Sequence, residues 1–284
     1  MKKHPVTNGD ELSGILRYII FNIKNRIVLE QTFDWIEGMK FYAKKGDAGI
    51  VGNIYYGLYE FVESIFLIHL LEKDDVFLDV GANVGHYSLL MSGIKKCRSI
   101  ALEPVPKTFQ QLVRQIELNK LSGKVYLINK GVSNKESELF FSTDRGTMDG
   151  VVNKEYKNAV RIPVSTIDNM LNASVPLAIK IDVEGYEKYA LLGAQKTLEN
   201  QNLKVIIVEL NDSGRKYGVE DNEVYSELLK FGFKPFDYDF INRKLVSLNH
   251  YNKHKFNTIF VRDSNFVSAR LVSSKKIKIR NKFF

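Results

Sequence analysis

The chain has 284 residues, of which 44% are hydrophobic and 26% are charged, ordinary values for a soluble globular protein. This composition excludes a collagen-like, mucin-like or wholly disordered chain. The single cysteine, Cys97, excludes a disulfide framework and a multi-cysteine zinc site. No run of about 18 uncharged apolar residues predicts a transmembrane segment, and the start of the chain lacks the apolar core of a secretory signal. The expected location is therefore cytoplasmic.

The formal net charge is +8, but the excess lies at the C-terminal end. Residues 264–284 contain six basic residues and no acid, which leaves +2 for residues 1–263. A nucleic-acid-binding protein would spread basic residues over the body of the domain, so we expect no nucleic-acid partner. We expect the stretch from Arg270 to Lys282 to lie in a solvated, partly disordered tail. Peripheral contact of this tail with an anionic membrane is the alternative.

Two apolar helical patterns precede the main domain. From Leu12 to Ile27, apolar residues recur at helical spacing with basic residues between them, which predicts an amphipathic helix. We expect this helix to pack on the main domain, and the alternative is a helix that lies on a membrane surface. A second helix is expected from Leu58 to Leu71, and the glycine-containing stretch 44–53 is expected to be a loop.

From Asp74 onward, short apolar runs alternate with helical patterns. Strands are expected at 76–80, 99–102, 125–128, 139–141, 160–164, 177–181, 205–208, 235–238 and 258–261, and helices at 87–94, 107–119, 187–198 and 223–230. This alternation indicates βαβ units and a doubly wound, mostly parallel α/β sheet covered by helices on both faces. The predicted organisation is a helical extension over residues 1–72, the main domain over 73–263 and the basic tail over 264–284.

Ligands of such sheets bind at the carboxyl ends of the strands, so the residues after each strand are candidates for a site. The first strand ends in an Asp-Val-Gly-Ala-Asn-Val-Gly run from Asp79 to Gly85. Gly81 and Gly85 permit a tight turn close to a ligand, and Glu103, after the second strand, is placed to bind ribose hydroxyls. An acid at Asp79 would repel a dinucleotide pyrophosphate but suits the cationic amino-acid end of S-adenosylmethionine. A tight turn without any ligand is the alternative.

Three segments resemble the FkbM family of S-adenosylmethionine-dependent methyltransferases: the run from Asp79 to Gly85, the pair Glu103-Pro104, and a Lys-Ile-Asp-Val-Glu-Gly run from Lys180 to Gly185. The resemblance covers roughly residues 56–212. It implies the class I methyltransferase fold, a Rossmann-like sheet of seven strands with an antiparallel last strand. It also implies the residues that would bind S-adenosyl-L-methionine, with Glu103 on the ribose and position 132 beside the adenine: Asp79, Gly81, Asn83, Gly85, Glu103 and Val132.

The same resemblance places Asp182 and Glu184 at the end of the fourth strand, facing the transferred methyl group. Methyl transfer requires alignment of donor and acceptor, and an alcohol acceptor must also lose a proton to a nearby carboxylate or imidazole. The candidates for this base are Asp182, Glu184 and His86. Asp182 is favoured by position, and capping of the following helix is its structural alternative. Lys180 lies two residues earlier on the same face of the strand, so we expect it to pair with Asp182.

The leading hypothesis is a methyltransferase that acts on an oxygen of a sugar, polysaccharide or small natural-product acceptor, a class that rests on the FkbM association. The alternative is an inactive methyltransferase fold that binds the cofactor and serves as an interaction module. Asp182, Glu209 and Asn211 are similar to the oxygen ligands of magnesium-dependent methyltransferases, but their spacing is inexact and no metal is expected. Acceptor specificity is expected to come from residues 1–57, 143–159 and 212–222. The sequence predicts no oligomeric state.

Overall fold

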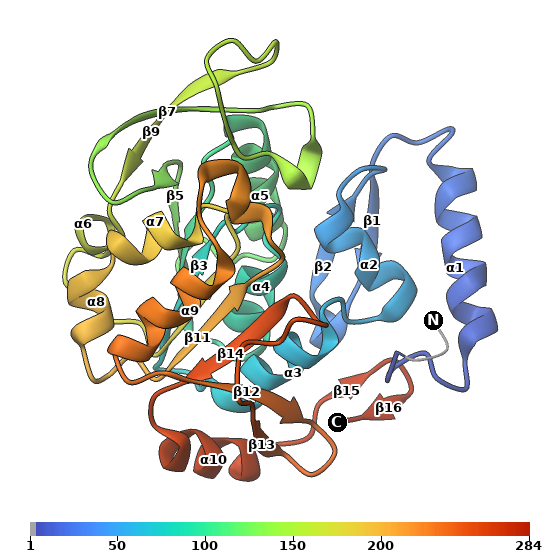
Figure 1. Cartoon of the computed structure of the whole chain (residues 1–284). Helices are drawn as coiled ribbons and strands as arrows, with labels where there is room; N and C mark the ends of the chain where they lie inside the picture. The colour runs from blue at the N-terminus through green and yellow to red at the C-terminus, as the bar shows by residue number, and fades with distance from the viewer. Residues whose placement is uncertain (1–3) are drawn as a thin grey trace.

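The computed structural model describes residues 4–284. A mixed sheet of eight strands forms its centre: β3 (Val76–Val80), β4 (Arg98–Leu102), β5 (Val125–Ile128), β10 (Ala178–Ile181), β11 (Val205–Glu209), β12 (Lys234–Asp239), β13 (Lys244–Ser247) and β14 (Asn257–Val261). The strand order is β13-β12-β14-β11-β10-β3-β4-β5 (Figure 1). The neighbours from β11 to β5 are parallel, whereas β14 is antiparallel to both β11 and β12.

This topology confirms the predicted fold class. The last strand predicted, β14, runs antiparallel to its neighbour β11, and the strands around β3 are parallel as expected. The structure adds an eighth strand, β13, which pairs with β12 as an edge hairpin. No residue of β13 is buried, so its sequence lacks the apolar alternation by which half-buried strands are identified.

Helices cover both faces of the sheet because alternate residues of its strands point to opposite sides. In β11, Val205 and Ile207 belong to the core of one face, and Ile206 and Val208 to that of the other. The first face carries α3 (Phe61–Leu70), α4 (His86–Leu89), α5 (Pro106–Leu118) and α10 (Ser264–Ser273), and the second carries α6 (Ile167–Leu171), α7 (Glu187–Leu192), α8 (Gln195–Glu199) and α9 (Asp221–Lys230).

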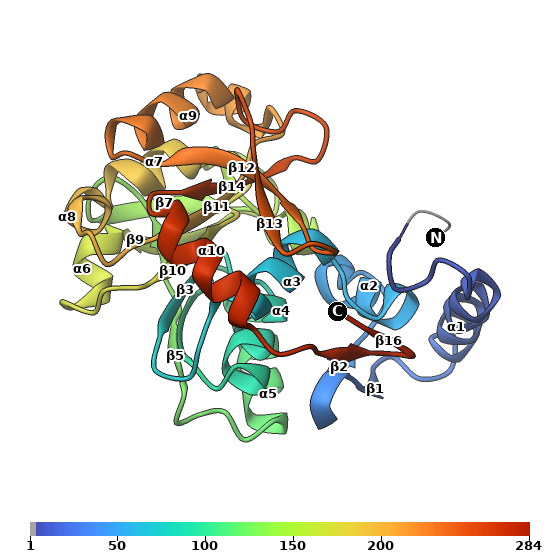
Figure 2. The ribbon, with the colours of Figure 1, turned by 90° about the horizontal axis from the view of Figure 1, so that it is seen from below.

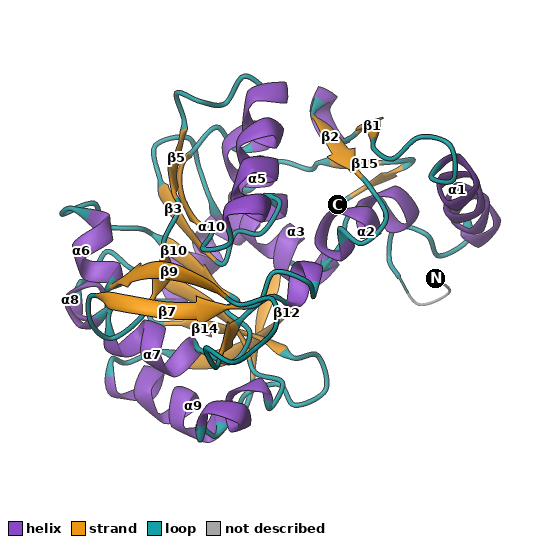
Figure 3. Ribbon diagram, turned by 90° about the horizontal axis from the view of Figure 1, so that it is seen from above, coloured by secondary structure: helices purple, strands orange, loops and turns teal. Residues whose placement is uncertain are grey.

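A smaller sheet lies beside the carboxyl ends of the central strands. It consists of β6 (Gly131–Val132), β9 (Val160–Ser165), β7 (Ser137–Phe141) and β8 (Val151–Val152), in that order. Figure 3 shows β7 and β9 in front of the central sheet when the molecule is seen from above. The strands predicted at 139–141 and 160–164 therefore form a sheet of their own, and the connection between β7 and β9 reaches the candidate site.

The N-terminal region contains more regular structure than the sequence predicts. β1 (Gln31–Asp34) and β2 (Lys40–Ala43) form an antiparallel hairpin, and α2 (Ala48–Tyr56) is helical where a loop was expected. The loop prediction holds for residues 44–47 and is wrong for residues 48–53, where the glycines do not end the helix. A Cβ at Gly52 would lie 2.4 Å from Cδ2 of Tyr59, so this glycine permits close packing. The domain boundaries predicted at 72/73 and 263/264 stay predictions.

Helix α1 (Glu11–Lys24) forms close to where it is predicted and packs on α2, but the side that it packs with is not its apolar stripe. Its buried residues are Gly14 and Phe21, whereas Leu12, Leu16 and Ile23 are 82%, 57% and 56% exposed. The apolar stripe therefore points away from the protein. Within residues 4–284, no helix has the length and apolar character needed to cross a bilayer.

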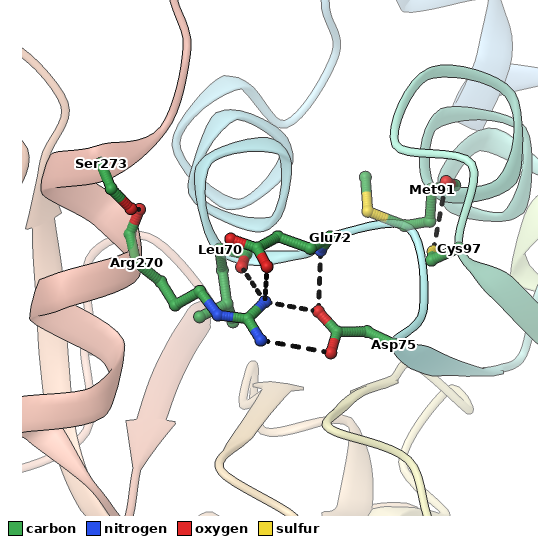
Figure 4. Close-up of polar contacts among 7 residues, drawn as sticks. All are labelled: Leu70, Glu72, Asp75, Met91, Cys97, Arg270 and Ser273. Carbon is green, nitrogen blue, oxygen red and sulfur yellow. Dashed lines mark hydrogen bonds and ion pairs between the residues drawn. The ribbon is translucent and has the colours of Figure 1, made fainter.

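The C-terminal segment is folded, which corrects the prediction of a disordered tail. Helix α10 packs on α3, and β15 (Lys278–Ile279) pairs with β16 (Lys282–Phe283). Arg270 of α10 lies 2.7 Å from Asp75 and also contacts Glu72 and the Leu70 carbonyl (Figure 4). Figure 2 shows the hairpin running back toward the N-terminal elements. The basic residues of this segment predict a solvated tail, but the apolar Ile277 and Ile279 between them are buried.

Candidate functional site

The glycine turn after β3 is shaped by its neighbours. Gly81 has φ +82°, and an added Cβ would lie 1.9 Å from the carbonyl oxygen of Asp182. Gly85 has φ +94°, and its added Cβ would lie 2.7 Å from Cδ1 of Leu112 in α5. Between them, Asn83 also has a positive φ of 51°. Both glycines are therefore required by φ and by close approach, and Gly85 packs against α5.

Two buried carboxyl groups hold the turn. Asp79 accepts hydrogen bonds from the backbone N–H and the hydroxyl of Ser88, at 3.0 and 2.6 Å. Glu103 accepts from the backbone N–H groups of Asn83 and Val105, at 3.0 and 2.9 Å. Burial raises the pKa of Asp79 to about 6 and that of Glu103 to about 7, against the opposing effect of these hydrogen bonds. Both side chains are therefore fixed in place from within the chain.

A first cavity opens between this turn and the smaller sheet. Four of the six predicted cofactor residues line it, namely Gly81, Asn83, Glu103 and Val132. Asp79 lines a second cavity instead. The first cavity also receives Gly146, Asp149 and Val151 from the connection between β7 and β9, which lies in the range predicted to shape specificity.

The second cavity adjoins the first and is rich in carboxyl groups. Among the described residues that line it are Glu60, Asp79, Asp182, Glu184 and Glu209, with Lys180 as their counter-charge. Four residues line both cavities, at the carboxyl ends of β3 and β10: Gly81, Asn83, Asp182 and Glu184. The structure thus brings the predicted catalytic carboxylates to the junction of the two cavities.

Lys180 and Asp182 form the predicted pair. The Lys180 Nζ atom lies 3.1 Å from Oδ2 of Asp182 and 5.8 Å from the centre of the Tyr87 ring. The Lys180 side chain is 1% exposed, and that of Asp182 is 31% exposed. Burial alone would lower the pKa of Lys180, but the carboxylates of Asp182, Glu60 and Glu209 raise it above its ordinary value. Lys180 therefore remains charged beneath an accessible Asp182.

Glu184 occupies a strained turn after β10. Its φ is +54°, and the following Gly185 could not carry a Cβ, which would lie 2.4 Å from the Ser213 carbonyl oxygen. Glu187 fastens this turn by accepting hydrogen bonds from the N–H groups of Val183 and Gly185, both at 3.1 Å. Glu187 thus has a positioning role here, and Glu184 is held at the cavity junction.

His86 lines the second cavity, yet both of its ring nitrogens have partners. Nδ1 lies 3.0 Å from the Asn53 amide nitrogen, and Nε2 lies 2.9 Å from the Ser64 hydroxyl, which donates to the Tyr59 carbonyl. Burial, together with the charge of Lys180, lowers the pKa of His86 to about 3. The neutral ring connects α2, α3 and α4, so we assign His86 a positioning role and no longer propose it as the base.

Sequence reasoning missed Glu60. It has φ +43° at the start of α3, accepts a hydrogen bond of 2.6 Å from the Tyr87 hydroxyl and another of 3.2 Å from the Asn257 amide. Its position after Gly57, ahead of an apolar helix, was the only signal. Glu209, considered above as an oxygen ligand, ends β11 in the same cavity. There burial and then the charge of Asp182 raise its pKa to about 8.

Asn211 does not join Asp182 and Glu209 as a possible metal ligand. Its side-chain oxygen accepts from the N–H of Ser213 at 3.0 Å. Across residues 4–284, no group of three His, Cys, Asp or Glu side chains has a metal-binding arrangement.

A model of the methyltransferase FkbM domain matches residues 79–235. The chain belongs to the FkbM methyltransferase family. This confirms the family predicted from the three segments, and the match begins at Asp79, on the strand that leads into the glycine turn.

Among curated proteins, the chain is 28% identical to hexuronic acid methyltransferase AglP of Haloferax volcanii over 148 residues, 51% of this chain and 59% of that protein. It is 33% identical over 67 residues to tRNA(Phe) (4-demethylwyosine(37)-C(7)) aminocarboxypropyltransferase of Pyrococcus horikoshii, 24% of each protein. The chain thus spans less than two thirds of either relative.

Solved structures similar to the FkbM chain include a methyltransferase of Pyrococcus furiosus, with a TM-score of 0.43, 14% identity and coverage of 87% of this chain and 97% of that one. Another is a Streptococcus mutans protein in complex with S-adenosylhomocysteine, with a TM-score of 0.45, 14% identity and coverage of 71% and 96%.

Proposed function

We propose that this FkbM-family chain is an S-adenosyl-L-methionine-dependent methyltransferase that methylates a hydroxyl oxygen of a sugar. The observation that carries the proposal is the junction of the two cavities at Gly81, Asn83, Asp182 and Glu184. A cofactor in the first cavity and an acceptor in the second would meet there. Family membership and the similarity to a hexuronic acid methyltransferase support the same reaction class.

The first cavity has a donor set that fits this cofactor. Glu103 offers a carboxylate whose orientation is held by two backbone N–H groups, which suits vicinal ribose hydroxyls. Val132 and Leu102 offer apolar surface for a purine, and Gly81 with Asn83 leaves the side near Asp182 open. S-adenosylmethionine, when bound, supplies a methyl group activated by its attachment to a sulfonium.

Asp182 is the proposed general base. It is accessible at the junction of the cavities and would accept the proton that the acceptor hydroxyl loses. Lys180, buried 3.1 Å away, orients the carboxylate and stabilises its charged form. Glu184 lies at the same junction and is the second candidate for this role.

The charges of the second cavity favour a neutral acceptor. Glu60 and Glu184 can accept hydrogen bonds from sugar hydroxyls, whereas the carboxylate of a uronic acid placed beside them and Asp182 would be repelled. We therefore propose a neutral, hydroxyl-rich sugar as the acceptor. This differs from the hexuronic acid named for the Haloferax volcanii relative.

Calorimetric titration with S-adenosylhomocysteine, and with NAD as the control, tests the cofactor assignment. We expect binding of S-adenosylhomocysteine and none of NAD, because Asp79 and the glycine turn disfavour a pyrophosphate. If neither ligand bound, the likeness would be one of fold alone and the proposed function would be abandoned.

Transfer of labelled methyl groups to matched acceptors tests the reaction. We expect neutral hexosides to be methylated and the corresponding uronates to react more slowly. Labelling of the uronates alone would overturn the neutral-acceptor proposal while leaving the cofactor assignment intact. Binding of S-adenosylhomocysteine without transfer to any acceptor would instead favour the inactive interaction module.

A further inference from the structure

The apolar face of helix α1 points into solvent. Figures 1 and 2 show α1 at the edge of the molecule, on the far side of α2 from the central sheet. We define the α1 apolar face as the six aliphatic side chains of this helix that are at least 42% exposed: Leu12, Ile15, Leu16, Ile19, Ile20 and Ile23. The chain beyond the helix continues the exposure, with Ile27 and Leu29 both 86% exposed.

The opposite side of α1 holds it to the protein. Gly14 and Phe21 are seven residues apart, on one side of the helix, and both are buried. Phe21 packs near Phe33 and Tyr55, and the Arg17 guanidinium donates to the carbonyls of Ile54 and Tyr55 at the end of α2. The helix is therefore attached by its narrow polar and aromatic side, the reverse of the usual arrangement on a globular protein.

An exposed aliphatic stripe of this size marks a surface that binds a partner. The charges around the stripe indicate which one. Between Glu11 and Glu30 every charged residue is basic. Of these, Arg17 faces α2, and Lys24 and Arg26 do not take part in that attachment. Lys24 and Arg26 are exposed, and Lys45 shares a shallow depression with Arg26 beside Ile19 and Ile23.

The C-terminal segment brings further basic groups to the same region. Arg280 and Arg17 both donate to the Ile54 carbonyl, at 3.2 and 3.1 Å. Lys282 donates to the carbonyls of Pro5 and Asn8, just before α1, at 2.8 and 2.6 Å. These contacts fasten the C-terminal hairpin beside the start of α1, and the hairpin carries the exposed Lys278.

We propose that the α1 apolar face is a docking surface for an anionic lipid bilayer, on which α1 lies parallel to the membrane plane. Aliphatic side chains would enter the boundary between headgroups and acyl chains, and the flanking lysines and arginines would contact the anionic headgroups. The proposal does not depend on the proposed reaction. The α1 apolar face is linked to the second cavity through α2, because α1 packs on α2 and Gly49 of α2 lines that cavity.

Vesicle co-sedimentation of the full chain tests this proposal. We expect binding to vesicles of phosphatidylcholine with phosphatidylglycerol, weaker binding at high salt, and little binding to phosphatidylcholine alone. The variant Leu16→Gln/Ile23→Gln should bind the anionic vesicles at least about tenfold less tightly, because two inserted aliphatic side chains are lost. The matched control is Leu229→Gln/Ile241→Gln, which removes two exposed aliphatic side chains elsewhere, 40% and 78% exposed, and should bind like the unaltered chain.

Three results would overturn the proposal: no binding to anionic vesicles, equal loss in the control variant, or unchanged binding in Leu16→Gln/Ile23→Gln. Analytical ultracentrifugation of the same samples tests the alternative, in which the face binds a second copy of the chain. If the chain formed a dimer that Leu16→Gln/Ile23→Gln converted to a monomer, the face would be an interface between two copies. Binding of S-adenosylhomocysteine, measured in parallel, reports whether the variants are folded.

Discussion

Charged and apolar side chains are placed in opposite ways at the carboxyl edge of the central sheet and at α1. At the sheet edge, Asp79, Glu103 and Lys180 are buried, and each has a partner within the chain. At α1, aliphatic side chains are exposed while Arg17 reaches inward to backbone carbonyls. A buried charge must be satisfied by the chain itself, whereas an exposed apolar stripe is completed from outside. The first region is therefore a preorganised site, and the second is a surface that awaits a partner.

The largest effect is expected at the glycine turn. Gly81→Ala places a Cβ 1.9 Å from a backbone oxygen at positive φ, so we expect a loss of about 3 kcal/mol or more of unfolding free energy, measured by urea denaturation. Gly232→Ala is the matched control, because Gly232 has φ +80° and open space around the added Cβ. It should lose only about 1 kcal/mol. Equal losses in both variants would mean that the turn is not constrained by β10.

The next effect concerns turnover. Asp182→Asn keeps the size of the side chain and its contact with Lys180 but removes the base, so the rate of methyl transfer should fall at least about a hundredfold. Calorimetry should show nearly unchanged binding of S-adenosylhomocysteine. Glu184→Gln provides the comparison at the same junction. If Glu184→Gln lost more activity than Asp182→Asn, the assignment of the base would pass to Glu184.

A smaller effect is expected for Glu103, the proposed ribose ligand. The Glu103 carboxylate accepts hydrogen bonds from two backbone N–H groups. In Glu103→Gln, the amide nitrogen would face one of these N–H groups and could not accept from it. We therefore expect the dissociation constant of S-adenosylhomocysteine to rise at least tenfold, roughly 1.4 kcal/mol. Tyr126→Gln, at an exposed position of the edge strand β5, should leave this constant unchanged. Unaltered affinity in Glu103→Gln would remove Glu103 from the proposed cofactor site.

The smallest effect on stability is expected at the α1 apolar face. Leu16→Gln/Ile23→Gln should change the free energy of unfolding by less than about 0.5 kcal/mol, since neither side chain is buried in the chain alone. Phe21→Ala on the opposite side of α1, 2% exposed, should cost about 3 kcal/mol. Both variants are compared by thermal unfolding. If Leu16→Gln/Ile23→Gln lowered the free energy of unfolding as much as Phe21→Ala, the α1 apolar face would belong to the protein's own core.

Much of the site was predictable because it follows from local spacing. Strand β3 covers the predicted residues 76–80, since a short apolar run between polar turns permits few other structures. The period of two residues along a strand placed Lys180 beside Asp182, and their ion pair follows from it. The predicted cofactor residues after β3 and β4 meet because the carboxyl ends of parallel neighbours lie at one edge.

Other parts of the site depend on contacts between distant segments. Glu60 reaches the second cavity from the start of α3, held by Asn257 from far along the chain. By its position in the motif His86 is a candidate base, but Asn53 and Ser64 occupy both of its ring nitrogens. A local sequence pattern does not reveal such partners, because each partner lies on another segment that reaches the site only when the chain has folded.

By itself, the sequence determined the α/β alternation, the glycine turn and the carboxylates at the strand ends, because these follow from periodicity and spacing along one segment. Only the tertiary structure decided which side of α1 faces the protein and that Ile277 and Ile279 draw the basic C-terminal segment into the fold. The physical reason is common to both. An amphipathic pattern states that a segment has an apolar side, but what covers that side depends on the surface that the rest of the chain, or a partner, presents to it.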